Sequence, residues 1–219
     1  MSEFDANAEE VRQWIAIGRM LLAEGRFDEA LALIEKATSA TSIPIALQSR
    51  AWRLKGMVLF RMRRYEDALA ASNRRIELRP AAAAGYLERA SDLSALERHD
   101  EAIADCEKAI ALEPENEIVW RYLGNVLFQA RRCSPARSAY ERAVALHPHD
   151  AKASVGLAET LAALGRHRAS VAACDQALQI MSVSEDAPRG SAWAKAEEVG
   201  ALQIKMYSLY QGISFEALG

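Results

Sequence analysis

Residues that could coordinate a metal or attack a substrate are few and scattered along this chain. His147 and His149 flank a proline that restrains their relative orientation, and no third ligand stands nearby. The three cysteines lack a neighbouring histidine or a resolving cysteine. A phosphate-cradling glycine loop, an HExxH segment and a Gly-x-Ser-x-Gly elbow are all absent. The sequence therefore predicts no enzyme activity, no cofactor and no metal.

Arginines next to aromatic residues carry a different chemistry, the recognition of another polypeptide. Guanidinium groups donate to carboxylates, while aromatic rings offer apolar surface for side chains. This mixture predicts a groove for an extended or helical segment that carries at least one acidic group. The alternative is that the same side chains only solubilise an open surface. The predicted peptide-binding residues are Arg19, Arg50, Arg53, Met57, Phe60, Arg121, Tyr122, Asn125, Phe128 and Lys152.

Composition and charge narrow the class of protein. The chain has 219 residues, of which 51% are hydrophobic and 26% charged, as expected for a folded protein. Its net charge of −3 gives no general reason to expect nucleic acid or an anionic membrane as a partner. The acidic start, Met1 to Glu10, does not resemble a secretory signal, and no stretch approaches the roughly 18 to 20 apolar residues of a membrane span. We expect a cytoplasmic protein without membrane insertion.

A repeat of 34 residues organises most of the chain. Pro80, Pro114 and Pro148 each follow a similar apolar run and stand 34 residues apart. A four-residue insertion, Ile45 to Gln48, separates the first repeat from the second. The predicted repeats span residues 11–44, 49–82, 83–116, 117–150 and 151–184, after an N-terminal tail of residues 1–10.

Each repeat has the pattern of a helical hairpin. In the fourth repeat, apolar residues recur at three- and four-residue steps, which places them on one face of a helix. A second such run ends near Pro148, where proline cannot continue the hydrogen-bond ladder. The residues that carry the two runs are Trp120, Leu123, Gly124, Leu127, Ala136, Tyr140, Ala143, Val144 and Leu146.

Position in the repeat also assigns the cysteines. Cys106 and Cys174 occupy equivalent places in second helices where the pattern prefers a packed aromatic, so both are predicted core residues. Cys133 falls in a turn beside Arg132, whose charge favours the thiolate. A redox role for Cys133 is the disfavoured alternative.

This pattern resembles the tetratricopeptide repeat, most closely through Trp120, Leu123, Gly124, Leu127, Ala136, Tyr140 and Pro148. The resemblance implies an all-α fold, a right-handed superhelical solenoid of antiparallel helix pairs. It also implies a protein-interaction scaffold, adaptor or co-chaperone that holds a peptide in its concave groove. Lys55 and Arg89 depart from the pattern at a leucine position, and Arg75 departs at an alanine position.

Some members of this family hold a terminal carboxylate in a clamp of basic residues and asparagines. Arg121 and Asn125 match its first two positions, but Gly156 stands where the next asparagine would be needed. The resemblance therefore does not predict a complete clamp. We expect a looser site in which Arg53, Arg121 and Asn125 anchor an acidic partner.

Charge alternates strongly between the second and third repeats. Residues 49–82 carry nine Lys and Arg against three Asp and Glu, and residues 83–116 carry the reverse. The simplest interpretation is that neighbouring repeats attract each other. An RNA-binding array is a further hypothesis. It is disfavoured because the acidic repeat would interrupt the continuous basic surface that binds a phosphate backbone.

Beyond residue 184 the repeat decays into a linker and a predicted helix within residues 185–219. Trp193, Ala196, Gly200 and Ile204 could form one face that caps the last hairpin. The alternative is a homodimer through this helix, and with it a second functional hypothesis, a structural self-association module. In that case Trp193, Tyr207 and Tyr210 would lie at the interface.

Overall fold

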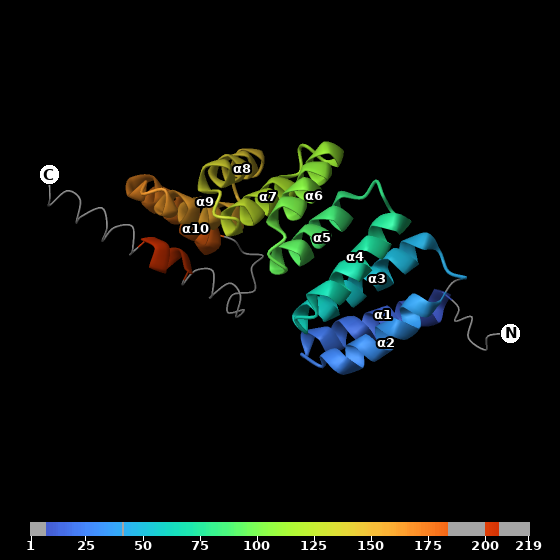
Figure 1. Ribbon diagram of the computed structural model, residues 1–219. Helices are drawn as coiled ribbons and strands as arrows, with labels where there is room; N and C mark the ends of the chain where they lie inside the picture. The colour runs from blue at the N-terminus through green and yellow to red at the C-terminus, as the bar shows by residue number, and fades with distance from the viewer. Residues whose placement is uncertain (1–7, 41, 184–199, 206–219) are drawn as a thin grey trace, which may run out of the picture. The chain divides into compact units, whose positions relative to one another are not determined.

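The computed structural model describes residues 8–40, 42–183 and 200–205 of the chain. Helices follow one another throughout these residues, no strand occurs among them, and consecutive helices pair as antiparallel hairpins (Figure 1). The all-α fold of antiparallel helix pairs is therefore confirmed. The helices are α1 (Ala8–Ala23), α2 (Phe27–Ser39), α3 (Ile45–Arg61), α4 (Tyr65–Leu78), α5 (Ala83–Ala95), α6 (His99–Leu112), α7 (Glu117–Gln129), α8 (Cys133–Leu146), α9 (Ala151–Ala163) and α10 (His167–Val183).

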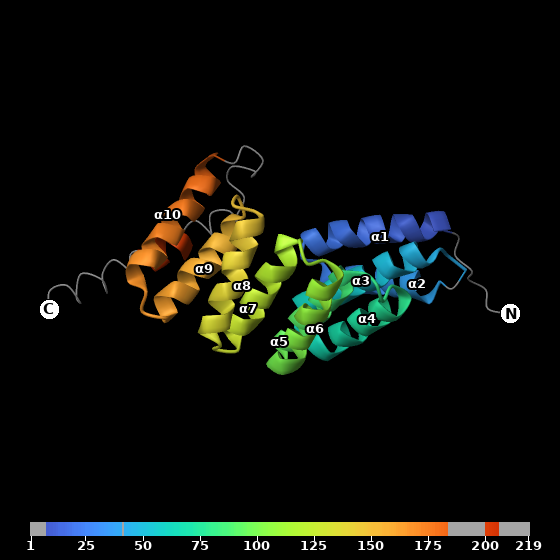
Figure 2. The same cartoon turned by 90° about the horizontal axis from the view of Figure 1, so that it is seen from above.

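The chain divides into two compact units, which we describe separately. The first unit runs to Leu112 and contains α1–α6, and the second starts at Glu113 and contains α7–α10. Figure 2 shows the helices of each hairpin running back along one another, for example α3 with α4 and α9 with α10. A short helical segment at residues 200–205 also belongs to the second unit.

The turn inside every hairpin has the same backbone geometry. One residue of each turn has a positive φ, between 60° and 78°, and the next residue donates its N–H to the carbonyl five positions back, which closes the first helix. Glycine occupies this left-handed position in the first and fifth turns, but larger residues occupy it in the other three. The five residues are Gly25, Arg63, Glu97, Arg131 and Gly165.

Prolines and N-cap residues in the sequence mark where helices end and begin. Helices α4, α6 and α8 each end two residues before the prolines that define the period. Asn116 and Asp150 then cap α7 and α9, since their side chains accept backbone N–H groups of the first helical turn. The insertion Ile45 to Gln48 forms the first turn of α3.

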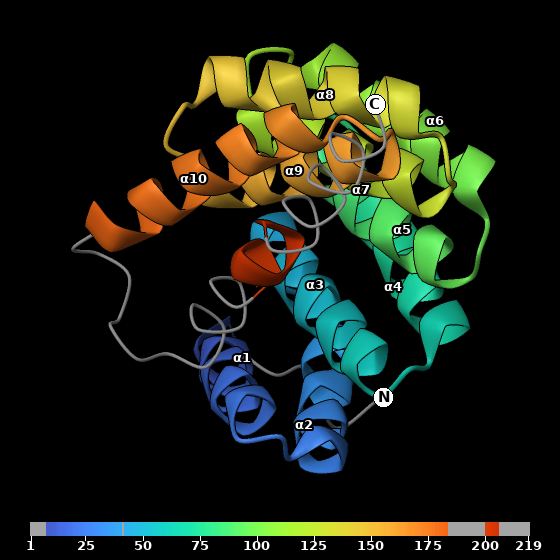
Figure 3. The same ribbon diagram turned by 90° about the vertical axis from the view of Figure 1, so that its left-hand side faces the viewer.

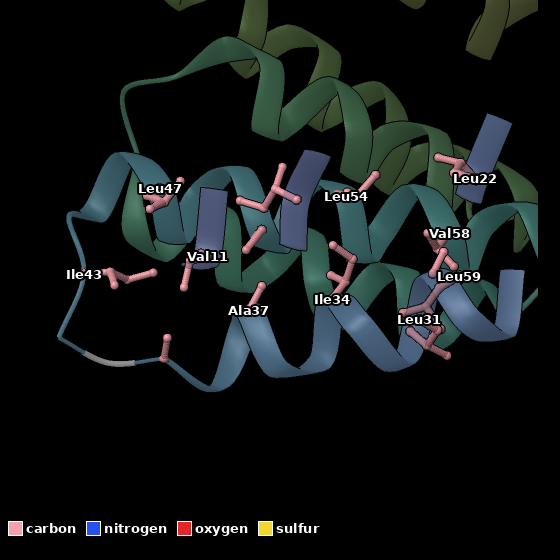
Figure 4. Packing of buried hydrophobic residues seen from close by; sticks show 14 of the residues in the cluster. Val11, Leu22, Leu31, Ile34, Ala37, Ile43, Leu47, Leu54, Val58 and Leu59 are labelled. Carbon is pink, nitrogen blue, oxygen red and sulfur yellow. The ribbon is translucent and has the colours of Figure 1, made fainter. Parts of the chain in front are cut away.

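The core of the first hairpin and α3 is a continuous apolar cluster. Ile34 of α2 is fully buried and points toward α3, where Leu54 and Val58 lie (Figure 4). Gly18 allows this close packing, because a Cβ there would lie 2.7 Å from Ile34 Cδ1. Burial of such side chains supplies the main stabilisation of the hairpin stack.

Charged residues at expected apolar positions are paired inside the first unit. Lys55 lies over the Trp52 ring, 5.3 Å from its centroid, and 3.5 Å from Glu35 Oε1. Arg75 is bound to Glu88. These departures from the apolar pattern are therefore accommodated by ionic contacts between neighbouring helices.

Arg89 of α5 makes the most extensive of these contacts. Its Nε and Nη2 donate to the two oxygens of Asp105 at 2.6 Å each, and its Nη1 donates to Asn73 at 2.9 Å. Asp105 is almost fully buried. Such bidentate geometry offsets the cost of removing two charges from water.

A single tyrosine organises the core of the second unit. Tyr140 of α8 is 2% exposed, and its ring lies against the backbones of Gly124 in α7 and Gly156 in α9. A Cβ on either glycine would lie within 2.8 Å of ring atoms. The predicted glycine and tyrosine positions thus form one packing unit.

The predicted C-terminal cap is described only in part. Ile204 packs against a small cluster of α9 and α10 that includes Leu161 and Cys174, and Lys205 pairs with Asp175. Trp193, Tyr207 and the rest of the predicted capping or dimerising helix lie outside the described residues.

Candidate peptide-binding groove

Two adjoining cavities open on the first unit. The first, which we call the arginine cavity, has a volume of about 360 Å³ and lies between α1 and α3, with Arg19, Arg50, Arg53 and Arg61 in its lining. The second, the Trp52 cavity, has a volume of about 280 Å³ and extends from α3 to α4 and α5. Figure 3 shows α3 next to α1 on one side and α4 on the other. Leu22, Arg53, Met57 and Arg61 line both cavities.

Five predicted peptide-binding residues meet at these cavities. Arg19 and Arg50 are exposed and have no ion-pair partner among the described residues. Arg53 Nε lies 3.0 Å from Glu88 Oε1 but keeps more than half of its side chain exposed. Met57 is also exposed, and Phe60 is half-buried, with its ring 5.3 Å from that of Tyr65. The arrangement offers cations and apolar surface side by side.

The predicted anchors of the second unit make internal contacts instead. Arg121 is 18% exposed, its Nε lies 2.8 Å from Asp150 Oδ2, and its guanidinium lies 5.8 Å from the centre of the Tyr122 ring. Asn125 Oδ1 accepts a hydrogen bond of 2.7 Å from the Tyr140 hydroxyl. Side chains that already contact a charged or polar neighbour gain less from a ligand.

Phe128 and Lys152 complete the predicted set. Phe128 of α7 is half-buried, and Lys152 is exposed near the start of α9. Gly156, the position that breaks the carboxylate clamp, is the residue against which Tyr140 packs. The missing asparagine therefore has a structural reason.

The Trp52 cavity contains residues that the sequence analysis did not select. Asp92 of α5 is 4% exposed and is hydrogen-bonded to the Ser72 hydroxyl of α4. It lines the cavity together with Glu88 and Ser91. Burial raises the pKa of Asp92 to about 7, although the Ser72 hydrogen bond opposes this shift. Burial also raises the pKa of Glu88, against the opposing effect of Arg75 and Arg53.

A sequence signal for this cavity exists in the repeat itself. Ser72 stands two repeats before Tyr140, at the equivalent place in its second helix. Where Tyr140 fills the space beside Gly124, Ser72 leaves the space beside Gly56 open, and both Ser72 and Gly56 line the cavity.

The other candidates for chemistry have ordinary surroundings. Burial raises the pKa of the Cys106 thiol to about 12 and that of Cys174 to about 11, so both stay protonated. The rings of His147 and His149 lie 6.3 Å apart, centre to centre. Within the described part of the chain, no three His, Cys, Asp or Glu residues are grouped to hold a metal ion. No helix in that part combines the length and apolarity needed to cross a bilayer.

Comparison with known families settles the class of repeat. A sequence model described as Tetratricopeptide repeat matches residues 15–86, 87–134 and 124–184. The chain belongs to the tetratricopeptide-repeat family. Its repeats are therefore of a type that generally serves as a non-enzymatic protein-interaction module. No curated protein sequence matches the chain.

Solved structures of tetratricopeptide-repeat proteins share this fold. TTC0263, a protein of Thermus thermophilus, has 19% identity and a TM-score of 0.70, covering 88% of this chain and 99% of its own. The Pseudomonas aeruginosa protein PilF has 16% identity and a TM-score of 0.66, covering 96% and 92%. YrrB, described as having an unusual peptide-binding site, has 18% identity and a TM-score of 0.58, covering 88% and 90%. At these identities the likeness concerns the fold.

Proposed function

We propose that this tetratricopeptide-repeat protein is an adaptor whose first unit holds a segment of a partner protein, with an acidic group of that segment in the arginine cavity. The observation that carries the proposal is the convergence of four arginines on one cavity that also has apolar walls. Carboxylates on a partner would complement these guanidinium groups.

Apolar contact must supply much of the affinity. Exposed ion pairs contribute only about 0 to 1 kcal/mol each, so the arginines by themselves give weak binding. Met57 is exposed at both cavities, and Phe60 lines the neighbouring one. A partner segment that covers these two side chains while it reaches the arginines would combine affinity with charge selectivity.

A displayed library of short peptides tests the proposal directly. We expect selection on the wild-type protein to enrich acidic peptides with a bulky apolar residue. The variant Arg50→Glu should lose the enriched peptides, because it places a negative charge in the arginine cavity. The control Arg79→Glu makes the same charge change at an exposed residue that does not line either cavity. Enrichment of peptides without an acidic residue, or equal capture by Arg50→Glu and the wild type, would contradict the proposal.

Other parts of the functional hypothesis stay predictions. They are the co-chaperone role, the cytoplasmic location and self-association through residues 185–219. The peptide selection does not depend on any of them, because it uses the purified protein and concerns only the first unit.

A further inference from the structure

The Trp52 cavity is a space that a side chain fills elsewhere in the same molecule. In the fourth repeat the Tyr140 ring lies against Gly124, so closely that a Cβ there would be 2.8 Å from ring atoms. In the second repeat a Cβ on Gly56 would meet no side chain or backbone atom closer than 3.7 Å, because Ser72 replaces the tyrosine. The cavity therefore has the place and the apolar walls of a side-chain pocket.

One carboxylate in this pocket lacks a cation. Asp92 is 4% exposed, and its side chain is hydrogen-bonded to the Ser72 hydroxyl. The two cations at the rim are directed elsewhere, since Arg53 binds Glu88 and Arg61 lies over the Phe27 ring at 5.6 Å. Among the described residues, no Lys or Arg forms an ion pair with Asp92.

We propose that the Trp52 cavity binds a basic side chain of the partner, a lysine whose carbon chain lies along Trp52 and Phe60 and whose ammonium group reaches Asp92. The inference rests on the proposed function, because it specifies a second residue of the segment held by the arginine cavity. The partner then carries a basic residue beside its acidic one. An ammonium group supplies the counter-charge that the buried carboxylate lacks, and aromatic rings favour the same cation.

The Ser72 hydroxyl can form a hydrogen bond with either protonation state of Asp92. The Ser72 hydroxyl also lies 3.1 Å from the carbonyl oxygen of Ala68, and its single hydrogen serves one acceptor at a time. When Ser72 donates to Ala68, a protonated Asp92 can donate to Ser72. A lysine that enters the pocket would favour the ionised carboxylate and release this proton.

Lysine binding should therefore strengthen as the pH rises through about 7. An acid with a pKa of about 7 becomes about 10-fold more ionised between pH 6 and pH 8. The lysine amine stays charged over this range. The charged groups that line the cavity with Asp92 are Glu88 on α5 itself and Arg53 and Arg61 on α3, and Arg75 on α4 is bound to Glu88.

Two small probes test the pocket without any peptide partner. Nα-acetyl-lysine N-methylamide and the uncharged Nα-acetyl-norleucine N-methylamide are titrated into the protein at pH 6 and pH 8, with the Trp52 indole followed by NMR. We expect the lysine probe to bind about 10-fold more tightly at pH 8 than at pH 6, and the norleucine probe to show no such change. Equal binding of the two probes at pH 8 would overturn the proposal.

Variants separate Asp92 from other carboxylates. Asp92→Asn should abolish the pH dependence of lysine binding, whereas Asp28→Asn, at an exposed residue of the same unit, should leave it unchanged. If Asp92→Asn does not fold, the carboxyl ¹³C resonance of Asp92 in the wild type gives the answer, since saturating lysine probe must lower its pKa. An unchanged pKa would overturn the proposal. A lysine probe that binds while Arg50→Glu still captures acidic peptides would contradict the proposed function but not this pocket.

Discussion

The second repeat, in the first unit, and the fourth repeat, in the second unit, treat the same position in opposite ways. Tyr140 fills the space between Gly124 and Gly156 in the second unit, and its hydroxyl donates a hydrogen bond to Asn125 Oδ1. Ser72, the equivalent residue of the second repeat, leaves a cavity of about 280 Å³. A cavity is therefore present where the second repeat departs from the packing pattern, and the equivalent space is filled where the fourth repeat follows it.

Charge shows a second difference between the units. In the second unit, Arg121 of α7 is paired with Asp150, the residue that caps α9, and offers little to a ligand. In the first unit, Arg19 and Arg50 remain exposed at a cavity, while the deeper cations Arg75 and Arg89 have buried or half-buried partners. The first unit thus separates structural cations from cations that face solvent, which is what an acidic partner requires.

The largest expected effect comes from breaking the buried pair of the first unit. Asp105→Ala should lower the free energy of unfolding by about 3–5 kcal/mol, because Arg89 keeps its charge and loses both carboxylate contacts. Urea denaturation measures this. The control Asp67→Ala removes an exposed pair with Arg64 and should cost at most about 1 kcal/mol. Equal costs for the two variants would show that Arg89 and Asp105 do not stabilise the unit.

The second prediction concerns the pH dependence that Asp92 gives to the first unit. Burial raises its folded-state pKa to about 7, above the value near 3.9 of an unfolded chain. The folded state therefore binds the proton more tightly, and this contribution to stability is lost as the pH rises from about 4 to about 7. Asp92→Asn should match the wild type at pH 4 and exceed it by on the order of 2–4 kcal/mol at pH 8. Thermal denaturation over this range checks the difference, and a constant difference would contradict the account.

Gly56 of the second repeat and Gly124 of the fourth should respond to substitution with opposite signs. Gly124→Ala should lower stability by about 1–3 kcal/mol, because the new Cβ overlaps the Tyr140 ring. Gly56→Ala should raise stability by up to about 1 kcal/mol, because its Cβ meets only ordinary contacts and alanine favours the helix. Parallel urea titrations measure both changes. The same sign for both would mean that Ser72 does not leave the space described.

The smallest expected effect is common to both units. Glu97→Gly in the first unit and Arg131→Gly in the second should each raise stability by about 0.5–1 kcal/mol, since glycine adopts the positive φ of these turns without strain. Gly25 and Gly165 already occupy the equivalent positions. Differential scanning calorimetry would detect the shift in melting temperature, and lower melting temperatures would argue against strained turns.

Much of the fold could be predicted because its signals are local and periodic. Prolines at a 34-residue spacing mark the ends of second helices, and apolar steps of three and four residues mark the buried faces. The same periodicity placed Arg19, Arg50 and Arg53 on one surface. These inferences require only the helical periodicity, which determines the face of the helix on which each residue lies.

The internal contacts of the second unit could not be predicted in this way. Whether Asn125 faces a ligand or the Tyr140 hydroxyl depends on distances between two helices, which periodicity does not give. Asp92 was missed because polar residues are usually exposed, whereas this one is buried against Ser72. The sequence signal for the cavity is Ser72, a serine at the repeat position where the fourth repeat has Tyr140. The signal can be recognised only when the two repeats are compared.

The central claim is that the first unit, and not the second, presents the cations that hold an acidic partner. Arg50 and Lys152 test it directly, because they are exposed and occupy the same position of the second and fifth repeats. An acidic peptide selected on the wild type is titrated by isothermal calorimetry into Arg50→Glu and Lys152→Glu. We expect Kd to rise about 10-fold or more for Arg50→Glu and to stay within about 2-fold for Lys152→Glu. Weakening by Lys152→Glu alone would contradict the account.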